Sequence, residues 1–461
     1  MKKILSTAFT MAALVCSMNA NAIKNGSDVS ASEYKDYIVR IELQNTSGGT
    51  ASCGALLVGG NYLLTAGHCV GSYNWNGTNV DYQWFVDNGA TNAIRIYQGV
   101  DFNSDTYTDA TYSVEPLLDT SGKETAAYNV ATSEYTAVKA QNVGGNWAVT
   151  DTIINNAYHT AVWHRDIALL KLNKSVAQVD HAAMVSAYDQ TDDSLAVAIN
   201  DTLTFRGWGK TETGSYPTVM QKTTVTNTLA DSTFASGVAT GAASAGLCLN
   251  DGSACTYDVT DYFTFTPPTV GDTGNDGDSG TPLVLNSEDK VVGVTKDTDY
   301  STNTRFTTLS FYLPSIKDAI NKVTAPSSLA FETTTNSTSG ITHKFTIQNV
   351  TGGNETLAPY LSGANGMYTL SGCSVTLATM ESCELTLQVN PSNTAISATH
   401  TATLNLTDAN DTQIPISYSV SSNSGTESGT GTGSASGGGG GSMGFGFLFA
   451  MFSLGIWRKN R

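Results

Sequence analysis

The stretch LLTAGHC at residues 63–69 decides the fold class, because an apolar run leads directly into a histidine and a cysteine. Leu63 and Leu64 are typical of a short buried strand. His68 follows that strand at once, so a turn carries its imidazole. A disulfide from Cys69 to Cys53 would staple this turn and hold the imidazole more firmly than a free loop could.

Two further stretches supply the partners that such a histidine needs. HRDIALL at residues 164–170 sets Asp166 before an apolar run, and GDSGTP at residues 277–282 sets Ser279 beside glycine. Attack on an amide requires a hydroxyl whose proton passes to an imidazole, which a carboxylate holds in its productive tautomer. His68, Asp166 and Ser279 supply these groups, and we predict that they are catalytic. The alternative, a plain turn serine at residue 279, is disfavoured by the three matching stretches.

The three stretches, together with GWG at residues 207–209, resemble the trypsin/chymotrypsin-like serine endopeptidases over residues 23–322. The resemblance implies an all-β fold of two six-stranded antiparallel barrels, with the catalytic groups in the cleft between them and a helix at the end. It also implies hydrolysis of protein substrates through an acyl-enzyme. This chemistry requires no cofactor and no metal.

An oxyanion hole and an activating N-terminus are further expectations. Gly277 has no side chain, so its N–H and that of Ser279 can turn toward one point, where each donor contributes about 3 to 4 kcal/mol. The resemblance implies that a mature chain beginning at Ile23 inserts its α-amino group beside Asp278. Signal cleavage after Ala22 would create that end without a separate activating protease.

The resemblance places the specificity residue six positions before the nucleophile, at Thr273, with Asp272 one position earlier. Asp272 in the pocket would favour Arg or Lys in the substrate, whereas Thr273 would give a neutral pocket. The acidic composition favours basic side chains, because it steers cationic substrates toward the protein. Lys296 and Asp297, which follow a predicted strand, are further candidates for the pocket lining.

Three features depart from the family pattern. The separation between His68 and Asp166 is long, and residues 71–150 are predicted to contain an insertion, which a protein surface tolerates well. Asn275 stands where the family has a cysteine, so a disulfide that braces the pocket should be absent. Thr281 stands where the family has a glycine. These departures bear on the geometry of the pocket.

Short alternating apolar runs separated by Gly, Asn and Asp predict many short strands in the protease segment, residues 23–325. The clearest runs are residues 37–43, 55–58, 167–172 and 290–295. One helix is predicted over residues 314–322, with Ile316 and Ile320 on its buried face behind a serine cap at Ser315. The antiparallel barrel therefore has a helix at its C-terminal end.

Residues 326–420 differ in composition, being rich in Thr and Ser with period-two runs at residues 344–347, 384–389 and 400–406. They predict a second, smaller β-sandwich. The pattern resembles bacterial Ig-like modules that are appended to secreted enzymes.

Seven cysteines are present, and Cys16 lies in the predicted signal peptide, which leaves six in the mature chain. An even count in a secreted protein favours disulfides. Short separations favour pairing between neighbours: Cys53 with Cys69, Cys248 with Cys255, and Cys373 with Cys383. A zinc site is the alternative, and the sequence lacks the Cys-x-x-Cys spacing typical of one.

Both ends of the chain carry targeting patterns. Residues 1–22 combine a basic start, an apolar stretch and an Ala-Asn-Ala exit, which favours a removable secretory signal peptide over a buried first helix. Residues 421–442 are a Gly/Ser-rich linker, and residues 443–461 are an apolar segment with a basic end. This order resembles the GlyGly-type C-terminal sorting tails of Gram-negative bacteria. It implies type II secretion through the periplasm, cutting by a membrane protease, and release or retention at the cell surface; a membrane anchor is the alternative.

The chain has 40 acidic and 23 basic side chains, for a net charge of −17 at pH 7. Such a surface repels phosphate backbones and anionic lipids, so we expect no nucleic-acid partner, and membrane contact only through the uncut tail. Proteins and peptides are the expected substrates of a monomeric enzyme. Asp101, Asp105 and Asp109 lack the glycine and glutamate of a known calcium loop, which favours a solvated acidic loop. The alternative function is a non-catalytic adhesin that uses residues 326–420.

Overall fold

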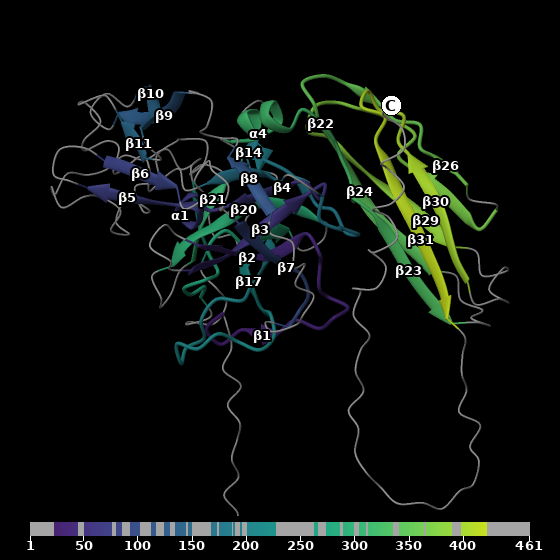
Figure 1. The fold of residues 1–461 in the computed structure, drawn as a ribbon, viewed down its shortest axis with the longest axis horizontal. Helices are drawn as coiled ribbons and strands as arrows, with labels where there is room; N and C mark the ends of the chain where they lie inside the picture. Colours follow the sequence, from purple (N-terminus) through teal and green to yellow (C-terminus); the bar gives the residue numbers. More distant parts are fainter. Residues whose placement is uncertain are drawn as a thin grey trace, which may run out of the picture.

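The computed structural model describes residues 23–44, 50–75, 80–84, 93–101, 112–116, 124–129, 134–143, 146–149, 167–172, 175–186, 188–189, 194–195, 201–226, 262–265, 273–285, 289–298, 304–309, 312–334, 341–363, 366–389 and 398–421. Nearly all the elements in these segments are strands, which confirms the all-β fold class (Figure 1). The predicted signal peptide and the sorting tail lie outside them. No helix within the described ranges is long and apolar enough to span a membrane.

The first barrel is closed by six antiparallel strands, in the order β12-β4-β3-β2-β7-β8. These strands are β2 (Ile38–Gln44), β3 (Thr50–Val58), β4 (Tyr62–Thr65), β7 (Ala93–Tyr97), β8 (Tyr112–Pro116) and β12 (Ala168–Leu172). The predicted strand at Leu63 and Leu64 is β4, and both side chains are fully buried. Alternate residues of β2 and β3 fill the barrel, as expected for strands whose successive side chains point to opposite faces.

The second barrel is a curled sheet of eight described strands, in the order β1-β17-β16-β19-β20-β21-β18, with β13 added beside β20. The strands are β1 (Ser27–Asp28), β13 (Ala183–Met184), β16 (Thr202–Gly207), β17 (Gln221–Thr226), β18 (Tyr262–Phe265), β19 (Pro282–Leu285), β20 (Lys290–Thr298) and β21 (Thr304–Thr308). It exceeds the predicted six strands because two-residue strands extend the sheet. One hydrophobic cluster, including Leu64, Val284 and Ile316, joins the two barrels.

The segment predicted to contain an insertion, residues 71–150, follows the short helix α1 (Gly67–Val70). Besides β7 and β8, it forms a separate five-stranded sheet in the order β5-β6-β11-β10-β9. Its strands are β5 (Gly71–Trp75), β6 (Val80–Trp84), β9 (Glu124–Asn129), β10 (Glu134–Val143) and β11 (Asn146–Val149). In Figure 1 this sheet lies at the opposite side of the barrels from the C-terminal strands. A smaller pair, β14 (Tyr188–Asp189) and β15 (Ser194–Leu195), lies between β13 and β16 in sequence.

The predicted helix is α4 (Leu313–Ile320), and its apolar residues Ile316 and Ile320 are buried as expected. The predicted cap at Ser315 is wrong, because the helix begins two residues earlier. Tyr312 occupies the N-cap without a side-chain hydrogen bond, and Pro314 lies in the first turn, where its missing N–H costs nothing. Asn321 ends the helix in the left-handed conformation, with φ of 43°.

The C-terminal segment forms a β-sandwich of two four-stranded sheets, β22-β24-β29-β27 and β23-β31-β30-β26, with β25 paired to β28. The strands are β22 (Lys322–Thr324), β23 (Leu329–Thr334), β24 (Ile341–Val350), β25 (Glu355–Thr356), β26 (Tyr360–Ser362), β27 (Tyr368–Gly372), β28 (Thr376–Leu377), β29 (Ser382–Val389), β30 (Ala398–Asn405) and β31 (Gln413–Ser421). Phe345, Leu385, Leu404 and Ile416 fill the space between the sheets.

Two of the three predicted disulfides are confirmed. Cys53 is bonded to Cys69 beside the catalytic candidates, and Cys373 is bonded to Cys383 in the sandwich. The third predicted pair, Cys248 with Cys255, lies outside the described residues.

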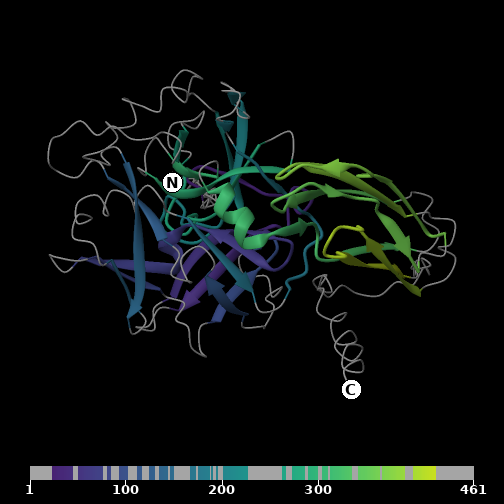
Figure 2. The same ribbon diagram turned by 90° about the horizontal axis from the view of Figure 1, so that it is seen from above.

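The sandwich is joined to the barrels by a buried, hydrogen-bonded interface, and Figure 2 shows the two units side by side. The fully buried amide of Gln348 on β24 binds the main chain of Met184, accepting its N–H at 2.9 Å and donating to its carbonyl at 2.6 Å. Ser327 accepts the N–H of Gln178 at 2.8 Å and donates to the carbonyl of Val176 at 2.6 Å. These bonds satisfy polar groups that would be costly to bury alone.

His181 should make the protein sensitive to acid. Its side chain is 1% exposed, and burial lowers its pKa from 6.5 to about 3. The folded state therefore holds a neutral imidazole that the unfolded chain protonates below pH 6.5. Its contribution to stability is complete above that pH and is lost as the pH falls toward 3, at about 1.4 kcal/mol per pH unit.

Urea unfolding of the wild type and of His181→Phe at pH 7, 5 and 4 would check this expectation. The variant should lose less stability than the wild type between pH 7 and pH 4, because phenylalanine does not titrate. Equal losses in the two proteins would contradict it.

Candidate active site

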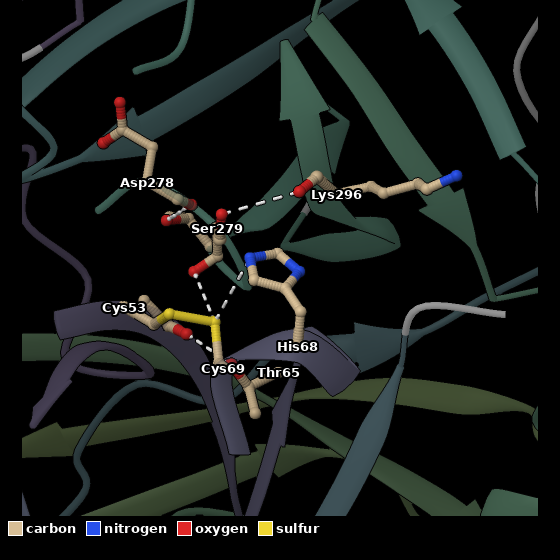
Figure 3. Close-up of a disulfide and its surroundings, with 9 residues drawn as sticks. Cys53, Thr65, His68, Cys69, Asp278, Ser279 and Lys296 are labelled. Atoms are coloured by element: carbon tan, nitrogen blue, oxygen red, sulfur yellow. Dashed lines mark hydrogen bonds between the residues drawn. A yellow bond between two sulfur atoms is a disulfide. The ribbon is translucent and has the colours of Figure 1, made fainter. Parts of the chain in front are cut away.

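His68 lies on α1, directly after β4, and the Cys53–Cys69 disulfide fastens this turn to β3. The sulfur of Cys69 is 4.0 Å from Nε2 of His68 and 3.6 Å from the carbonyl oxygen of Ser279. Two of the predicted catalytic residues therefore meet at this disulfide, although they are far apart in sequence (Figure 3). Both side chains are partly exposed, as residues that act on a substrate must be.

Ser279 lies on a tight turn that ends one residue before β19. Its Oγ donates a long hydrogen bond of 3.5 Å to the carbonyl of Lys296 on β20. Its carbonyl accepts the N–H of Gly54 at 2.8 Å, which ties the turn to β3 of the other barrel. Gly277 and Gly280 have φ values of 100° and 82°, in the region that favours glycine, so the GDSG pattern reflects backbone geometry.

The turn fits against the first barrel with no spare room. A Cβ on Gly280 would collide with Thr65 and with the carbonyl of Gly54, and a Cβ on Gly54 would collide with Thr281. The hydroxyl of Thr65 also donates to the carbonyl of Gly54 at 2.7 Å. Gly54 and Thr65 were not predicted to be site residues, since their closeness to Ser279 depends on how the barrels pack.

Asp278 is fully buried, and its carboxylate accepts the N–H groups of Gly209 at 2.7 Å and Asn275 at 2.9 Å. Burial raises the pKa of this carboxyl from 3.8 to about 7, although both hydrogen bonds oppose the rise. A Cβ on Gly207 or Gly209 would collide with the carboxylate. The two glycines of the GWG stretch therefore pack directly against the carboxylate of Asp278. The side chain of Asp278 points away from His68 in Figure 3.

Ile23, the predicted mature terminus, is fully buried. The next residue, Lys24, donates its N–H to the carbonyl of Thr273 at 3.0 Å, so the start of the predicted mature chain is anchored at the predicted pocket residue. Thr273 is itself fully buried. The pairing of Ile23 with Asp278 stays a prediction.

The other pocket candidates differ in how they are placed. Lys296 is fully buried, and Figure 3 shows its carbonyl facing Ser279 while its side chain extends away from the serine. The place of Lys296 in the pocket lining stays a prediction. Asp297 follows on β20, at a shift in register relative to β21, and Asp272 lies outside the described residues. Asn275, which replaces a family cysteine, donates from Nδ2 to the carbonyl of Thr211 at 3.0 Å and so still braces this turn.

Asp166 lies outside the described residues. The strand that follows it, β12, begins at Ala168, which pairs with Thr65 at the end of β4. Asp105 and Asp109 also lie outside them, so the calcium alternative stays untested. Cys53, His68 and Cys69 lie close enough to suggest a metal site, but both sulfurs are in the disulfide and are not thiolates.

The chain matches the family model described as Trypsin over residues 23–114 and 120–320, which is more than half of its length. Phenoloxidase-activating factor 1 of Holotrichia diomphalia is 26% identical over 209 residues, which is 45% of this chain and 47% of that protein. The chain thus spans about half the length of this curated relative.

Among solved structures, the VesB protease of Vibrio cholerae aligns with a TM-score of 0.34 and 18% identity, covering 86% of this chain and 99% of that one. The secreted serine protease VesC of the same organism aligns with a TM-score of 0.31 and 16% identity, covering 86% of this chain and 71% of that one.

Proposed function

Since this chain belongs to the trypsin family, we propose that it is a secreted serine endopeptidase that hydrolyses protein substrates through an acyl-enzyme. The observation that carries the proposal is the meeting of His68 and Ser279 at one disulfide, with the nucleophile turn fixed against both barrels. Holding the reacting groups in the right geometry lowers the barrier to this chemistry.

In the proposed mechanism, Oγ of Ser279 attacks the carbonyl carbon of the scissile peptide bond while His68 takes its proton. Asp166 would hold the imidazole in the productive tautomer and stabilise its positive charge. The oxyanion of the tetrahedral intermediate would accept the N–H groups of Gly277 and Ser279. His68 then returns the proton to the leaving amine. Water next attacks the acyl carbon while His68 takes a proton from it, and His68 gives that proton to Oγ of Ser279 as the acyl–oxygen bond breaks.

The proposed preference is for cleavage after Arg or Lys. It rests on the acidic composition, with 40 acidic against 23 basic side chains, and on Asp272 next to the buried Thr273. An acidic protein attracts cationic substrates at a distance, and a carboxylate in the pocket would pair with a basic side chain. Cleavage of a peptide library would test this preference separately from activity itself.

The cellular setting is also a proposal. Residues 1–22 would direct export, and cleavage after Ala22 would expose Ile23. The tail at residues 443–461 would be cut by a membrane protease, which leaves the enzyme at the surface of a Gram-negative cell or free in the medium. N-terminal sequencing and intact mass of the secreted protein would test both cuts.

The proposed function is tested by covalent labelling with a fluorophosphonate probe. A folded chain that begins at Ile23 should be labelled at Ser279, and it should cleave a protein substrate. Absence of labelling in folded protein that begins at Ile23 would reject the proposal. A binding role for the sandwich would then be the hypothesis to test.

A further inference from the structure

The carbonyl of Asp278 is held by two donors from one residue. Thr281 donates its N–H at 3.1 Å and its hydroxyl at 2.5 Å to this oxygen. Thr281 is fully buried, so water does not compete for either bond. The carbonyl therefore has a fixed direction within the turn.

This direction also fixes the N–H of Ser279. The carbonyl of Asp278 and the N–H of Ser279 belong to one planar trans peptide group, in which they point in opposite directions. A rotation that moved the N–H would have to move the carbonyl and break both bonds from Thr281. Ser279 N–H is one of the two donors of the proposed oxyanion hole, and donors there must be aimed before the charge develops.

The second proposed donor is fixed in the same way by a different group. The N–H of Gly277 shares its peptide group with the carbonyl of Asp276, which accepts the N–H of Lys210 at 2.7 Å. Here the holding donor is main chain, so a side-chain substitution cannot remove it. At Ser279, by contrast, one of the two holding bonds depends on the identity of residue 281.

We propose that Thr281 is a positioning residue whose hydroxyl orients the Ser279 N–H in the oxyanion hole, a role that rests on the proposed function. The hydroxyl has room because Gly54 faces it without a side chain. Asn275 stands where the family has a bracing cysteine, so this turn depends on hydrogen bonds for its shape.

The test compares Thr281→Val, which keeps the branched shape and loses the hydroxyl, with Thr281→Ser, which keeps the hydroxyl. Thr295→Val is a matched control. Thr295 is also buried and donates its hydroxyl to a turn carbonyl, that of Thr281, at 2.9 Å. That carbonyl shares its peptide group with Pro282, which has no N–H to aim.

Thr281→Val should lower kcat about tenfold or more with KM changed less than about twofold, since complete loss of an oxyanion donor costs about 10²- to 10³-fold. A peptide aldehyde forms a hemiacetal with Ser279, and the oxygen of that hemiacetal lies in the oxyanion hole. The affinity of Thr281→Val for such an aldehyde should therefore fall in parallel with kcat. Thr281→Ser and Thr295→Val should keep the wild-type kcat, while Thr295→Val should lose as much thermal stability as Thr281→Val.

Equal kcat values for Thr281→Val and Thr295→Val would overturn the proposal, and so would a loss confined to KM. If Thr281→Val does not fold, Thr281→Ala against Thr281→Ser gives the same comparison without a methyl group pressed on Gly54. Failure of the wild type to turn over substrate would instead reject the proposed function, and the fluorophosphonate experiment separates the two cases.

Discussion

Ser279→Ala is expected to lower kcat by about 10⁶-fold, because the nucleophile and its base act as one unit. The free energy of unfolding should change by less than about 1 kcal/mol, since the lost hydroxyl is partly exposed and makes a hydrogen bond of 3.5 Å, at the long limit for such bonds. Steady-state hydrolysis of a protein substrate, together with urea unfolding of both proteins, measures the two quantities.

The double variant that combines Ser279→Ala with His68→Ala supplies the control. His68→Ala alone should cost about as much as Ser279→Ala, and combining them should cost little more, because neither residue works without the other. Asp166→Asn should lower kcat by about 10⁴-fold through the wrong tautomer of the imidazole. Losses that multiply in the double variant would contradict a shared catalytic unit, and substantial activity in Ser279→Ala would exclude Ser279 as the nucleophile.

The second large effect is expected at Ile23, the predicted start of the mature chain. A protein beginning at Ile23 should be more active than one retaining Ala22 by about 10²- to 10⁴-fold, because breaking a buried ion pair costs about 3 to 5 kcal/mol. The reason lies in Asp278, whose carboxylate is fully buried and whose pKa burial raises to about 7. A free α-amino group at Ile23 would supply the missing positive charge. The two forms can be made from a fusion protein and compared by kcat/KM.

Stability against pH gives an independent check on this pairing. Without an ammonium partner, the pKa of Asp278 is about 7 in the folded state against 3.8 when unfolded, so its contribution to stability is complete below pH 3.8 and is lost as the pH rises to 7. The Ala22 form should lose stability over this range, at up to about 1.4 kcal/mol per pH unit, relative to the Ile23 form. Asp278→Asn should remove the difference. Identical activity and identical pH dependence in the two forms would contradict the pairing.

The sequence predicted the parts of the site that depend on local pattern. The strand at Leu63 and Leu64, the histidine turn after it, and the disulfide from Cys53 to Cys69 could be predicted because neighbouring residues determine them. The burial of Lys296 could not be predicted from the sequence, because it depends on the register shift between β20 and β21.

Long-range packing explains the other omissions. Gly54 and Thr281 are more than 200 residues apart, and their contact exists because two barrels meet there. The sequence predicts an insertion within residues 71–150 but no individual strands there, whereas the structure forms a five-stranded sheet after α1. The cap at Ser315 was wrong because a serine before an apolar run is a frequent but not a necessary way to begin a helix.

The amide of Gln348, which holds the main chain of Met184 from both sides, has a mechanical consequence. A module tethered by a flexible linker would rotate freely, whereas these buried hydrogen bonds hold β24 of this sandwich against β13 of the second barrel. If the sandwich binds a surface, that surface would therefore set the direction in which His68 and Ser279 of the candidate active site face.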